Sequence, residues 1–402
     1  MAAARTRTDR PYDVVLCGAT GFTGGLTAER LAADGPEDLR WAISGRDGAK
    51  LEAVREWLAG LGKAGSGVEA LRCDVEDAAS VRALAEQTAV VATTVGPFLE
   101  YGEPLVAACA DAGTDYADIA GEPEFVDRMW LAHHERAERT GARVVHACGF
   151  DSVPHDLGVY FTVQQLPQDV PITVSGYVRV GASPSAGTYH SAIGAFARVR
   201  QASEVAAKRR KLETRPAGRR VRGLPRRPTR APAGRGWALP LPTIDPVVVR
   251  RSARAVDRYG PDFRYGHFAV VRRLRTAVVV PAALGGMVAL AQIPPGRDLL
   301  LRRRQAGDDP SAARRARSWF KVRFEGAGGD RRVSTEVSGG DPGYDETARM
   351  LAQSALCLAF DDLPDTAGQV TTVQAMGDAL LRRLRDDGMR FEVIESAGLP
   401  DE

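Results

Sequence analysis

The sequence predicts an α/β fold: a parallel sheet covered by helices, followed by a second α+β domain inserted before C-terminal helices. Residues 12–147 alternate short apolar runs with segments of helical periodicity, which is the pattern of strand–helix–strand units. Beyond about residue 150, alternating polar and apolar residues, notably 319–325 and 331–337, are typical of an antiparallel sheet. The chain has 402 residues, which exceeds one ordinary core and suits two domains.

The first domain is expected to cover residues 10–158. Its predicted strands are apolar runs that end in glycine or polar residues, and they cover residues 12–17, 39–44, 68–73, 90–95, 114–119 and 143–147. Its predicted helices cover residues 22–33, 49–58, 77–86, 103–112 and 122–140. Apolar strands that alternate with helices are buried on both faces, so this part of the chain predicts a parallel sheet between two helical layers.

The second domain is expected over residues 159–342, with a role in binding substrate or in dimerisation. It has a predicted strand at 170–180 and a basic insertion at about 198–262, most of which lacks periodicity and is expected to be irregular. Residues 343–395 follow, with predicted helices at 344–360 and 373–386 that are expected to pack back on the first domain.

An apolar segment at 276–293 lies within a run of 21 uncharged residues, with arginines on both sides. The arginines are Arg272, Arg273 and Arg275 before it, and Arg297, Arg302, Arg303 and Arg304 after it. The length approaches that of a membrane span, but Pro281 and a glycine pair weaken a simple spanning helix. Three interpretations stay open: a buried helix or strand pair, a surface that lies on a membrane or lipid, and a true span.

Composition places the chain among globular proteins, with 44% hydrophobic and 26% charged residues. The net charge of +3 gives no reason to expect nucleic acid. The five cysteines form no CxxC pair and no close cluster with histidine, so free thiols in a reducing cytosol are expected and a metal site is not. The polar, Arg-rich N-terminal segment is unlike a secretory signal. These features predict a cytoplasmic protein, peripheral on the plasma membrane if the apolar segment binds lipid.

A glycine-rich turn follows the first predicted strand and opens the first predicted helix. In Gly18-Ala-Thr-Gly21-Phe-Thr-Gly24, the first glycine permits the tight turn, the second lets the backbone approach a pyrophosphate, and the third lets helix and strand pack closely. The unpaired N–H groups at the start of the helix then face the phosphates. The turn therefore predicts a dinucleotide-binding domain of the Rossmann type. The cofactor-binding residues expected here are Gly18, Thr20, Gly21, Phe22, Thr23 and Gly24.

The end of the second predicted strand decides between the two nicotinamide cofactors. Enzymes that use NAD usually place an acidic residue there, whereas this chain has Ser44, Gly45 and Arg46. A guanidinium pairs with the 2′-phosphate of NADP, so NADP is the predicted cofactor. Asp74, after the third strand, is expected near the adenine. The residues expected near the second phosphate and the nicotinamide ribose are Thr94, Val95, Gly96 and Pro97.

Several motifs together resemble the saccharopine dehydrogenase-like oxidoreductases, and in particular the trans-acting enoyl reductases of actinobacteria. They are GATGFTG, the SGR after strand two, TTVGPF with Tyr101-Gly102, Asp115-Tyr-x-Asp118 with Gly121-Glu122, CGFDSVPHDLG, Gly340-Asp-Pro-Gly-Tyr344 with Thr347, and Thr372-x-x-Gln-Ala-Met-Gly377. The resemblance implies an NADPH-dependent reduction of an enoyl intermediate on a polyketide synthase during glycolipid assembly, with membrane association. His155 stands where this family is expected to have a small residue.

The chain lacks Tyr-x-x-x-Lys, which excludes the usual acid–base pair of short-chain dehydrogenases. It also lacks Gly-x-Ser-x-Gly, which excludes the nucleophilic serine turn of the α/β hydrolases. An enoyl reductase needs a donor for the enolate oxygen and a proton for the α-carbon. Tyr101 is the first candidate donor, although it has an alternative role in packing under the cofactor. The second candidates are Asp151, Ser152 and His155, of which the first two equally suit capping of the following helix.

Partners and alternative functions also remain open. The basic insertion is either a solvated loop or a docking surface for an acyl carrier protein or an anionic membrane, and a homodimer is a further possibility. The substrate is expected to be a lipid-like or carrier-bound small molecule. Two other functions compete with enoyl reduction: saccharopine dehydrogenase-type amino-acid oxidoreduction, and a non-catalytic NADP sensor or membrane scaffold.

Overall fold

The computed structural model describes residues 9–182, 186–214, 216–232, 236–302 and 310–398. The chain divides into two compact units: residues 1–150 with 343–386, and residues 151–342 with 387–402. The boundary therefore falls between Phe150 and Asp151, whereas the predicted boundary at residue 158 lies within a helix. Most of the polar N-terminal segment, and Arg303 and Arg304 beside the apolar segment, lie outside the described residues.

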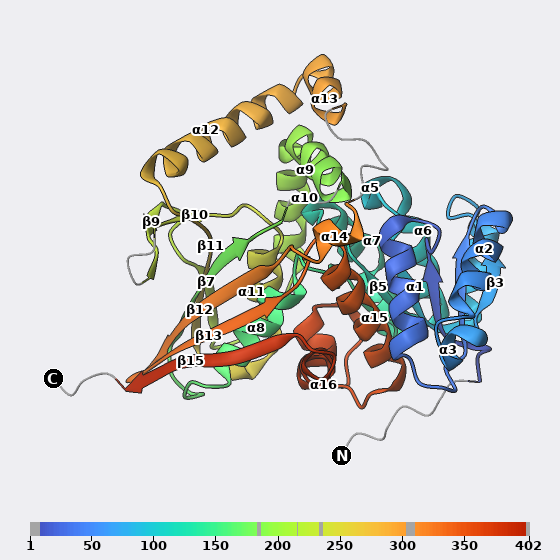
Figure 1. Ribbon diagram of the computed structural model, residues 1–402. Coiled ribbons are helices and arrows are strands. Elements are labelled where there is room, and N and C mark those ends of the chain that lie inside the picture. The colour runs from blue at the N-terminus through green and yellow to red at the C-terminus, as the bar shows by residue number, and fades with distance from the viewer. Residues whose placement is uncertain (1–8, 183–185, 215, 233–235, 303–309, 399–402) are drawn as a thin grey trace. The chain divides into compact units, whose positions relative to one another are not determined.

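The first unit is built on a parallel sheet, as the sequence predicted, and the sheet has seven strands (Figure 1). Its strand order is β14-β6-β5-β4-β1-β2-β3. The order reverses between β1 and β4, which is the place where parallel α/β sheets bind dinucleotides. The strands are β1 (Tyr12–Cys17), β2 (Trp41–Gly45), β3 (Glu69–Arg72), β4 (Thr88–Thr93), β5 (Asp115–Asp118), β6 (Arg143–Val145) and β14 (Gly368–Val370).

Helices cover this sheet because its central strands are apolar on both faces; Val14, Val15 and Leu16 of β1 are fully buried. The helices are α1 (Phe22–Asp34), α2 (Gly48–Leu58), α3 (Lys63–Ser66), α4 (Ala78–Glu86), α5 (Phe98–Tyr101), α6 (Glu103–Ala112), α7 (Pro123–Thr140), α15 (Asp345–Phe360) and α16 (Thr372–Asp386). Helix α15 packs against α1, β4 and β5, while α6 packs between α4 and α7. The C-terminal helices are thus part of the nucleotide-binding unit.

Strand β14 was not predicted, since its three residues carry no periodicity. An arginine on the neighbouring strand secures the segment that leads into it. The guanidinium of Arg143 donates to Pro364 O at 3.0 Å and to Thr366 Oγ1 at 3.2 Å. The backbone N–H of Arg143 donates to Asp115 Oδ1 at 2.8 Å, so β5, β6 and the C-terminal segment are joined through one residue.

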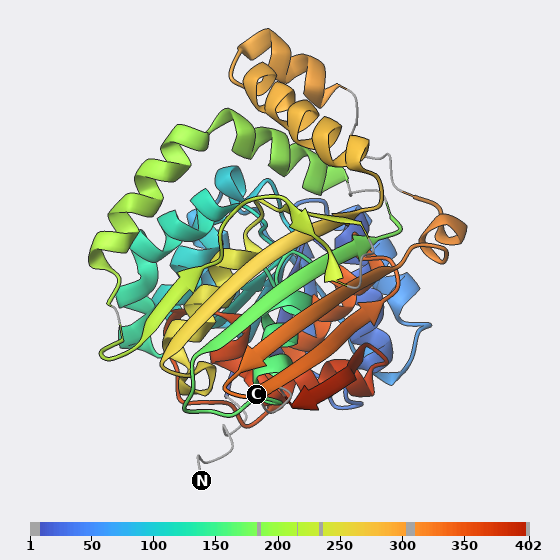
Figure 2. The same cartoon turned by 90° about the vertical axis from the view of Figure 1, so that its left-hand side faces the viewer.

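The second unit contains a mixed sheet of eight strands (Figure 2). The order is β15-β13-β12-β7-β11-β10-β9, and β8 pairs with β11. Strands β12 and β13 form the antiparallel pair that the sequence predicted, but β11 runs parallel to both β7 and β8. The strands are β7 (Ile172–Val180), β8 (Arg220–Gly223), β9 (Thr229–Arg230), β10 (Trp237–Pro240), β11 (Asp262–Val271), β12 (Phe320–Gly328), β13 (Arg331–Gly339) and β15 (Arg390–Gly398).

Helix α8 (Val153–Val163) packs on this sheet at close range. A Cβ at Gly158 would lie 2.3 Å from the ring of Phe324, so only glycine fits there. One turn later, the hydroxyls of Thr162 and Thr335 are hydrogen-bonded at 2.6 Å. The other helices are α9 (Ala186–Ala197), α10 (Val199–Leu212), α11 (Asp245–Ala255), η2 (Asp257–Tyr259), α12 (Leu274–Ala291), α13 (Pro294–Leu301) and α14 (Ala312–Arg315).

The expectation that residues 202–262 are irregular was wrong. They contain most of α10, three short strands and α11. The arginines that suggested a solvated loop are in part structural: Glu213 pairs with Arg209 at 3.2 Å and with Arg254 at 3.0 Å, and Arg209 is only 4% exposed. Ion pairs, rather than a periodic apolar face, hold this part of the chain together. The prediction relied on apolar periodicity and therefore did not detect these elements.

The apolar segment forms the exposed helix α12, so the interpretation as a buried helix or strand pair was wrong. Only 11% of the helix is buried. Its Ala291 and two neighbouring side chains, Ile193 of α9 and Leu300 of α13, form a small apolar cluster. Val278, Val279 and Val280 are 45–64% exposed. Within the described ranges of the chain, α12 alone is long and apolar enough to cross a membrane.

Candidate functional site

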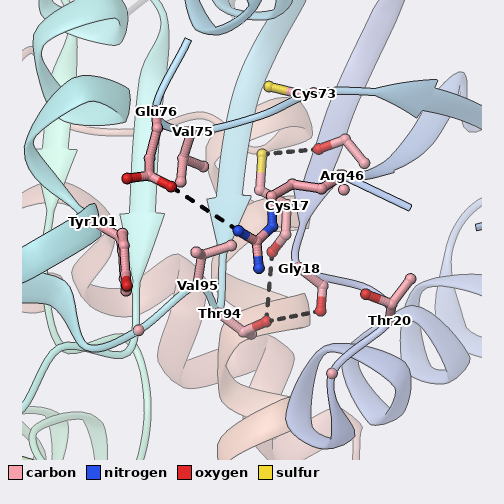
Figure 3. A pocket seen from close by; sticks show the side chains of 14 residues that line it. Cys17, Gly18, Thr20, Arg46, Cys73, Val75, Glu76, Thr94, Val95 and Tyr101 are labelled. Atoms are coloured by element: carbon pink, nitrogen blue, oxygen red, sulfur yellow. Dashed lines mark hydrogen bonds and ion pairs between the residues drawn. The ribbon is translucent and has the colours of Figure 1, made fainter. Parts of the chain in front are cut away.

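A pocket of about 280 Å³ lies in the first unit at the carboxyl ends of its strands (Figure 3). Its walls come from the segments that follow β1, β2, β3 and β4, together with α5. These segments meet because all four strands are parallel and therefore end at one edge of the sheet. The residues that line it are Cys17, Gly18, Thr20, Gly21, Ser44, Gly45, Arg46, Cys73, Val75, Glu76, Thr94, Val95, Gly96 and Tyr101.

The glycine turn has the geometry that its sequence predicted. Gly18 has a φ of +89°, and a Cβ there would lie 2.8 Å from Thr94 Oγ1. A Cβ at Gly24 would lie 2.0 Å from Gly18 O, so helix α1 crosses the end of β1 at a distance that excludes any side chain. The hydroxyl of Thr94 donates to Gly18 O at 3.3 Å and ties the turn to the end of β4.

Helix α1 begins directly at the pocket, and its N-terminus suits a bound anion. Gly21 is the N-cap residue, so no side chain caps the first turn, and that turn contains no acidic residue. Phe22, Thr23 and Gly24 are the first residues of the helix. Their backbone N–H groups and the helix dipole favour a phosphate group. The start of the helix therefore suits the pyrophosphate of a dinucleotide. Phe22, Thr23 and Gly24 are not among the residues that line the pocket, so only their backbone N–H groups are assigned to the phosphates.

The edge of the pocket carries one cation and one anion. Arg46 extends from the end of β2, and its Nη1 lies 4.0 Å from Oε2 of Glu76 (Figure 3). Both side chains are largely exposed, at 72% and 65%. The guanidinium is therefore accessible to a 2′-phosphate at this edge of the pocket, and its contact with that phosphate stays a prediction. Glu76 was missed because it follows a different strand from Arg46.

Asp74 does not line the pocket wall. Its Oδ1 accepts from the backbone N–H of Glu76 at 3.1 Å, so its carboxylate shapes the turn after β3. Two thiols do line the wall, and burial raises the pKa of Cys17 to about 12 and also raises that of Cys73. These thiols stay protonated near neutral pH and act as apolar surface rather than as nucleophiles.

Tyr101 ends the short helix α5 and lines the pocket, and a buried acid holds that helix in place. Glu122 Oε2 accepts from the backbone N–H of Leu99 at 3.0 Å. A Cβ at Gly102 would lie 2.6 Å from the ring of Phe125, so the chain after Tyr101 packs tightly on α7. Pro97, the N-cap residue of α5, lies outside the lining set. The motif residues Gly102 and Glu122 thus position the phenol of Tyr101.

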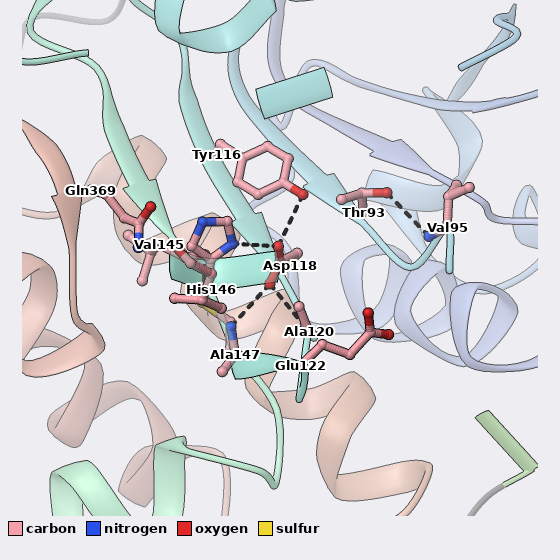
Figure 4. A network of polar contacts seen from close by, with 12 residues as sticks. Thr93, Val95, Tyr116, Asp118, Ala120, Glu122, Val145, His146, Ala147 and Gln369 are labelled. Atoms are coloured by element: carbon pink, nitrogen blue, oxygen red, sulfur yellow. Dashed lines mark hydrogen bonds and ion pairs between the residues drawn. The ribbon is translucent and has the colours of Figure 1, made fainter. Parts of the chain in front are cut away.

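A buried hydrogen-bond network centres on Asp118, at the end of β5 (Figure 4). Oδ2 accepts from Tyr116 Oη at 3.0 Å and lies 2.6 Å from His146 Nδ1. Oδ1 accepts from the backbone N–H groups of Ala120 at 2.9 Å and Ala147 at 3.0 Å. Ala147 has a φ of +59°, which costs a non-glycine residue about 1 kcal/mol, and the network holds it there.

Motifs far apart in the sequence meet within the first unit. The ring of Phe22 in the glycine turn makes an edge-on contact with Tyr344, with 4.9 Å between centroids. Thr347 Oγ1 accepts from the backbone N–H of Phe150 at 3.2 Å, and a Cβ at Gly149 would lie 2.9 Å from the same side chain. The C-terminal motif thus positions both the turn and the chain that leaves the first unit.

The remaining catalytic candidates belong to the second unit. Asp151 is its first residue, and burial raises the pKa of its carboxyl to about 6. Ser152 is fully buried and is the N-cap residue of α8, but its side chain makes no capping hydrogen bond. His155, in the first turn of α8, faces Asp245 and His267. Sequence reasoning did not connect these three residues, because they are far apart along the chain.

Comparison with known proteins agrees with this geometry. Residues 14–145 match the model of the saccharopine dehydrogenase NADP binding domain. A Mycobacterium tuberculosis protein whose name places it among the trans-acting enoyl reductases is 38% identical, with 98% of this chain and 100% of that protein covered. The trans-acting enoyl reductase of Mycobacterium bovis is 36% identical over 95% of this chain and 97% of its own length.

Two further similar proteins come from organisms other than mycobacteria. The Arabidopsis thaliana protein named "Probable mitochondrial saccharopine dehydrogenase-like oxidoreductase" is 30% identical over 95% of this chain and 96% of its own length. The solved apo saccharopine dehydrogenase (L-Glu forming) of Saccharomyces cerevisiae shares the fold, with a TM-score of 0.54, 12% identity and coverage of 95% and 99%. This chain therefore belongs to the saccharopine dehydrogenase family of oxidoreductases, and its first unit binds NADP.

Proposed function

We propose that this chain reduces the carbon–carbon double bond of an enoyl intermediate, with NADPH as reductant. The substrate class is a lipid-like or carrier-bound acyl group, of the kind used in polyketide-derived glycolipid assembly. The observation that carries the proposal is an NADP pocket in a chain that is 36–38% identical, over nearly its full length, to proteins named as trans-acting enoyl reductases.

The chemistry requires three things of the protein. The bound cofactor supplies a hydride to the β-carbon of the enoyl group. The protein then has to stabilise the negative charge on the enolate oxygen and deliver a proton to the α-carbon. It also has to fix the substrate close to the nicotinamide, because orientation accounts for much of the rate.

Tyr101 is the residue that we assign as donor to the enolate oxygen. Its side chain lines the same pocket as Val95 and Gly96, which follow β4, and Figure 3 shows Tyr101 at the pocket wall. Its helix is fixed by the hydrogen bond from Leu99 to Glu122, so the phenol has a supported position. Replacement of Tyr101 by Phe should lower kcat by about 100-fold and leave the Kd for NADPH unchanged. Full turnover in that variant would remove Tyr101 from this role.

The reaction class is tested with purified full-length protein, NADPH and two sets of substrates. We expect loss of NADPH absorbance with an α,β-unsaturated acyl thioester. Turnover with an amino acid and a 2-oxo acid instead would identify saccharopine-type chemistry. Binding of NADPH without turnover on either set would favour a sensor or scaffold. The Tyr101→Phe variant serves as the matched control, since it should bind NADPH equally well.

We further propose that α12 holds the protein on an anionic membrane surface, where a lipid-like substrate is available. The support is an exposed apolar helix between two groups of exposed cations. Each arginine near an anionic leaflet contributes about 1 kcal/mol. The described arginines are Arg272 and Arg273 before the helix, Arg275 in its first turn, and Arg297 and Arg302 after it.

Vesicle flotation tests this surface directly. The protein should float with phosphatidylglycerol-containing vesicles at low salt, less at high salt, and hardly with neutral vesicles. The paired substitutions Val279→Asp and Val280→Asp should abolish flotation, whereas Val393→Asp on β15, which is exposed to a similar degree, should not. Equal flotation of all three proteins would contradict the assignment. Salt-sensitive binding to acyl carrier protein without flotation would identify the other partner.

A further inference from the structure

Three buried side chains of the second unit converge from separate elements. His155 comes from the first turn of α8, Asp245 from the first turn of α11, and His267 from the middle of β11. Their side chains are at most 3% exposed. One ligand atom from each lies within 4.8 Å of the other two. None of the three lines the nucleotide pocket or was needed for the proposed reaction.

The donor atoms have the spacing of a metal site. His155 Nε2 lies 3.3 Å from Asp245 Oδ1, and His267 Nε2 lies 3.7 Å from Asp245 Oδ2. Ligands that bind one zinc ion tetrahedrally at 2.0–2.1 Å are about 3.3 Å apart, so both nitrogen–oxygen distances are close to those of a zinc site. Within the described part of the chain, Asp245 Oδ1 is buried and makes no hydrogen bond.

The surroundings of His267 orient its ring toward the cluster. Tyr265 Oη lies 2.9 Å from Nδ1 of His267. A hydrogen bond from Nδ1–H to that oxygen leaves the Nε2 lone pair directed at Asp245, and metal-bound histidines usually have such a partner on the second nitrogen. The rings of His155 and His267 are nearly perpendicular, with 4.6 Å between centroids, so both nitrogens approach the same space without stacking.

Other acidic groups also act on this point. The carboxylates of Asp151 and Asp156 interact electrostatically with Asp245, which is itself only 2% exposed. A divalent cation bound there would offset the repulsion between these carboxylates.

We propose that His155 Nε2, His267 Nε2 and a carboxylate oxygen of Asp245 bind a zinc ion that joins α8, α11 and β11. Two imidazoles with one carboxylate bind zinc in many metalloenzymes and also bind non-haem iron(II), whereas magnesium and calcium prefer oxygen ligands alone. Elemental analysis therefore has to measure iron together with zinc. The site differs from the nucleotide pocket in both residues and location within the fold. Its role is to fix the start of α8, the helix that follows Asp151.

The test uses the full-length chain without a polyhistidine tag, because a tag would itself bind zinc. After purification with added zinc and extensive dialysis, elemental analysis should find one zinc per chain. Cobalt added to chelator-stripped protein should give the visible absorption of tetrahedral Co²⁺ with nitrogen and oxygen ligands. Zinc should raise the Tm of stripped protein. Substoichiometric zinc, no cobalt spectrum and an unchanged Tm would overturn the proposal.

Variants assign the ligands. His155→Ser, His267→Gln and Asp245→Asn should each lose the zinc and the cobalt spectrum, while His134→Ala, in the first unit, should retain both. Binding of NADPH to each variant, measured in parallel, reports that the first unit is intact. Zinc retained by His155→Ser and by His267→Gln would exclude these histidines as ligands.

Discussion

Arg46 and Glu76 form an ion pair at the edge of the nucleotide pocket, with 4.0 Å between Nη1 and Oε2. The two residues follow different strands, β2 and β3, which pair in parallel with Gly45 opposite Arg72. In the absence of cofactor, Glu76 is a partner of the guanidinium that we assign to the 2′-phosphate. To bind Arg46, the 2′-phosphate of NADP therefore has to displace the carboxylate of Glu76. Glu76 thus affects how strongly the pocket prefers NADP to NAD.

Arg46→Ala should weaken NADPH binding by about 10- to 100-fold, because a charge-assisted hydrogen bond to phosphate contributes about 1.5–3 kcal/mol. The affinity for NADH, which lacks the 2′-phosphate, should change little. Fluorescence titration with both cofactors measures the two values. An unchanged Kd for NADPH would show that Arg46 is only a surface residue.

Glu76→Gln should have the opposite effect on the same cofactor. It removes a negative charge beside the phosphate and leaves Arg46 without a competing ion pair. Exposed pairs contribute about 0.2–1 kcal/mol, so NADPH should bind about two- to fivefold more tightly, with the gain largest at low salt. Titration at two salt concentrations checks this. Weaker NADPH binding would mean that Glu76 contacts the cofactor favourably.

Gly24→Ala should disrupt the nucleotide-binding unit, whereas Gly25→Ala should be tolerated. A Cβ at Gly24 would lie 2.0 Å from Gly18 O, a backbone atom that cannot move without opening the turn. At Gly25 the nearest atom is 3.6 Å from the new Cβ, an ordinary contact. Thermal unfolding and NADPH titration of the two variants should therefore differ sharply. Equal behaviour would show that the turn is more adaptable than its geometry indicates.

Asp118→Asn should destabilise the protein by about 3 kcal/mol, because the new amide places donors opposite Tyr116 Oη and His146 Nδ1. Asp111→Asn is the control: its carboxylate pairs with Arg136 at 3.1 Å on the surface, and an exposed pair contributes about 1 kcal/mol or less. Urea unfolding of both variants measures the difference. A loss at Asp118 no greater than at Asp111 would contradict the structural role of the network.

The sequence predicted the elements that depend on short-range pattern. The glycine turn, Arg46 and the antiparallel pair β12–β13 are each determined by neighbouring residues, and the structure places them as expected. Glu76 and the group of His155, Asp245 and His267 could not be predicted in this way, since strand order and the packing of α8 on its sheet bring them together. The exposure of α12 could not be decided from the sequence for the same reason, because apolar composition alone does not reveal whether a surface is covered.

The pH dependence of turnover separates Asp151 from Tyr101 as proton donor. Burial raises the pKa of Asp151 to about 6, so its acid form dominates below that pH. A donor has to be protonated, so if Asp151 rather than Tyr101 delivers the proton, kcat is constant below pH 6 and falls about tenfold for each pH unit above it. Asp151→Asn would remove this limb and lower the plateau, whereas Ser152→Ala would retain the limb. A profile that stays flat through pH 6 in the wild-type protein would exclude Asp151 and leave Tyr101 as the donor.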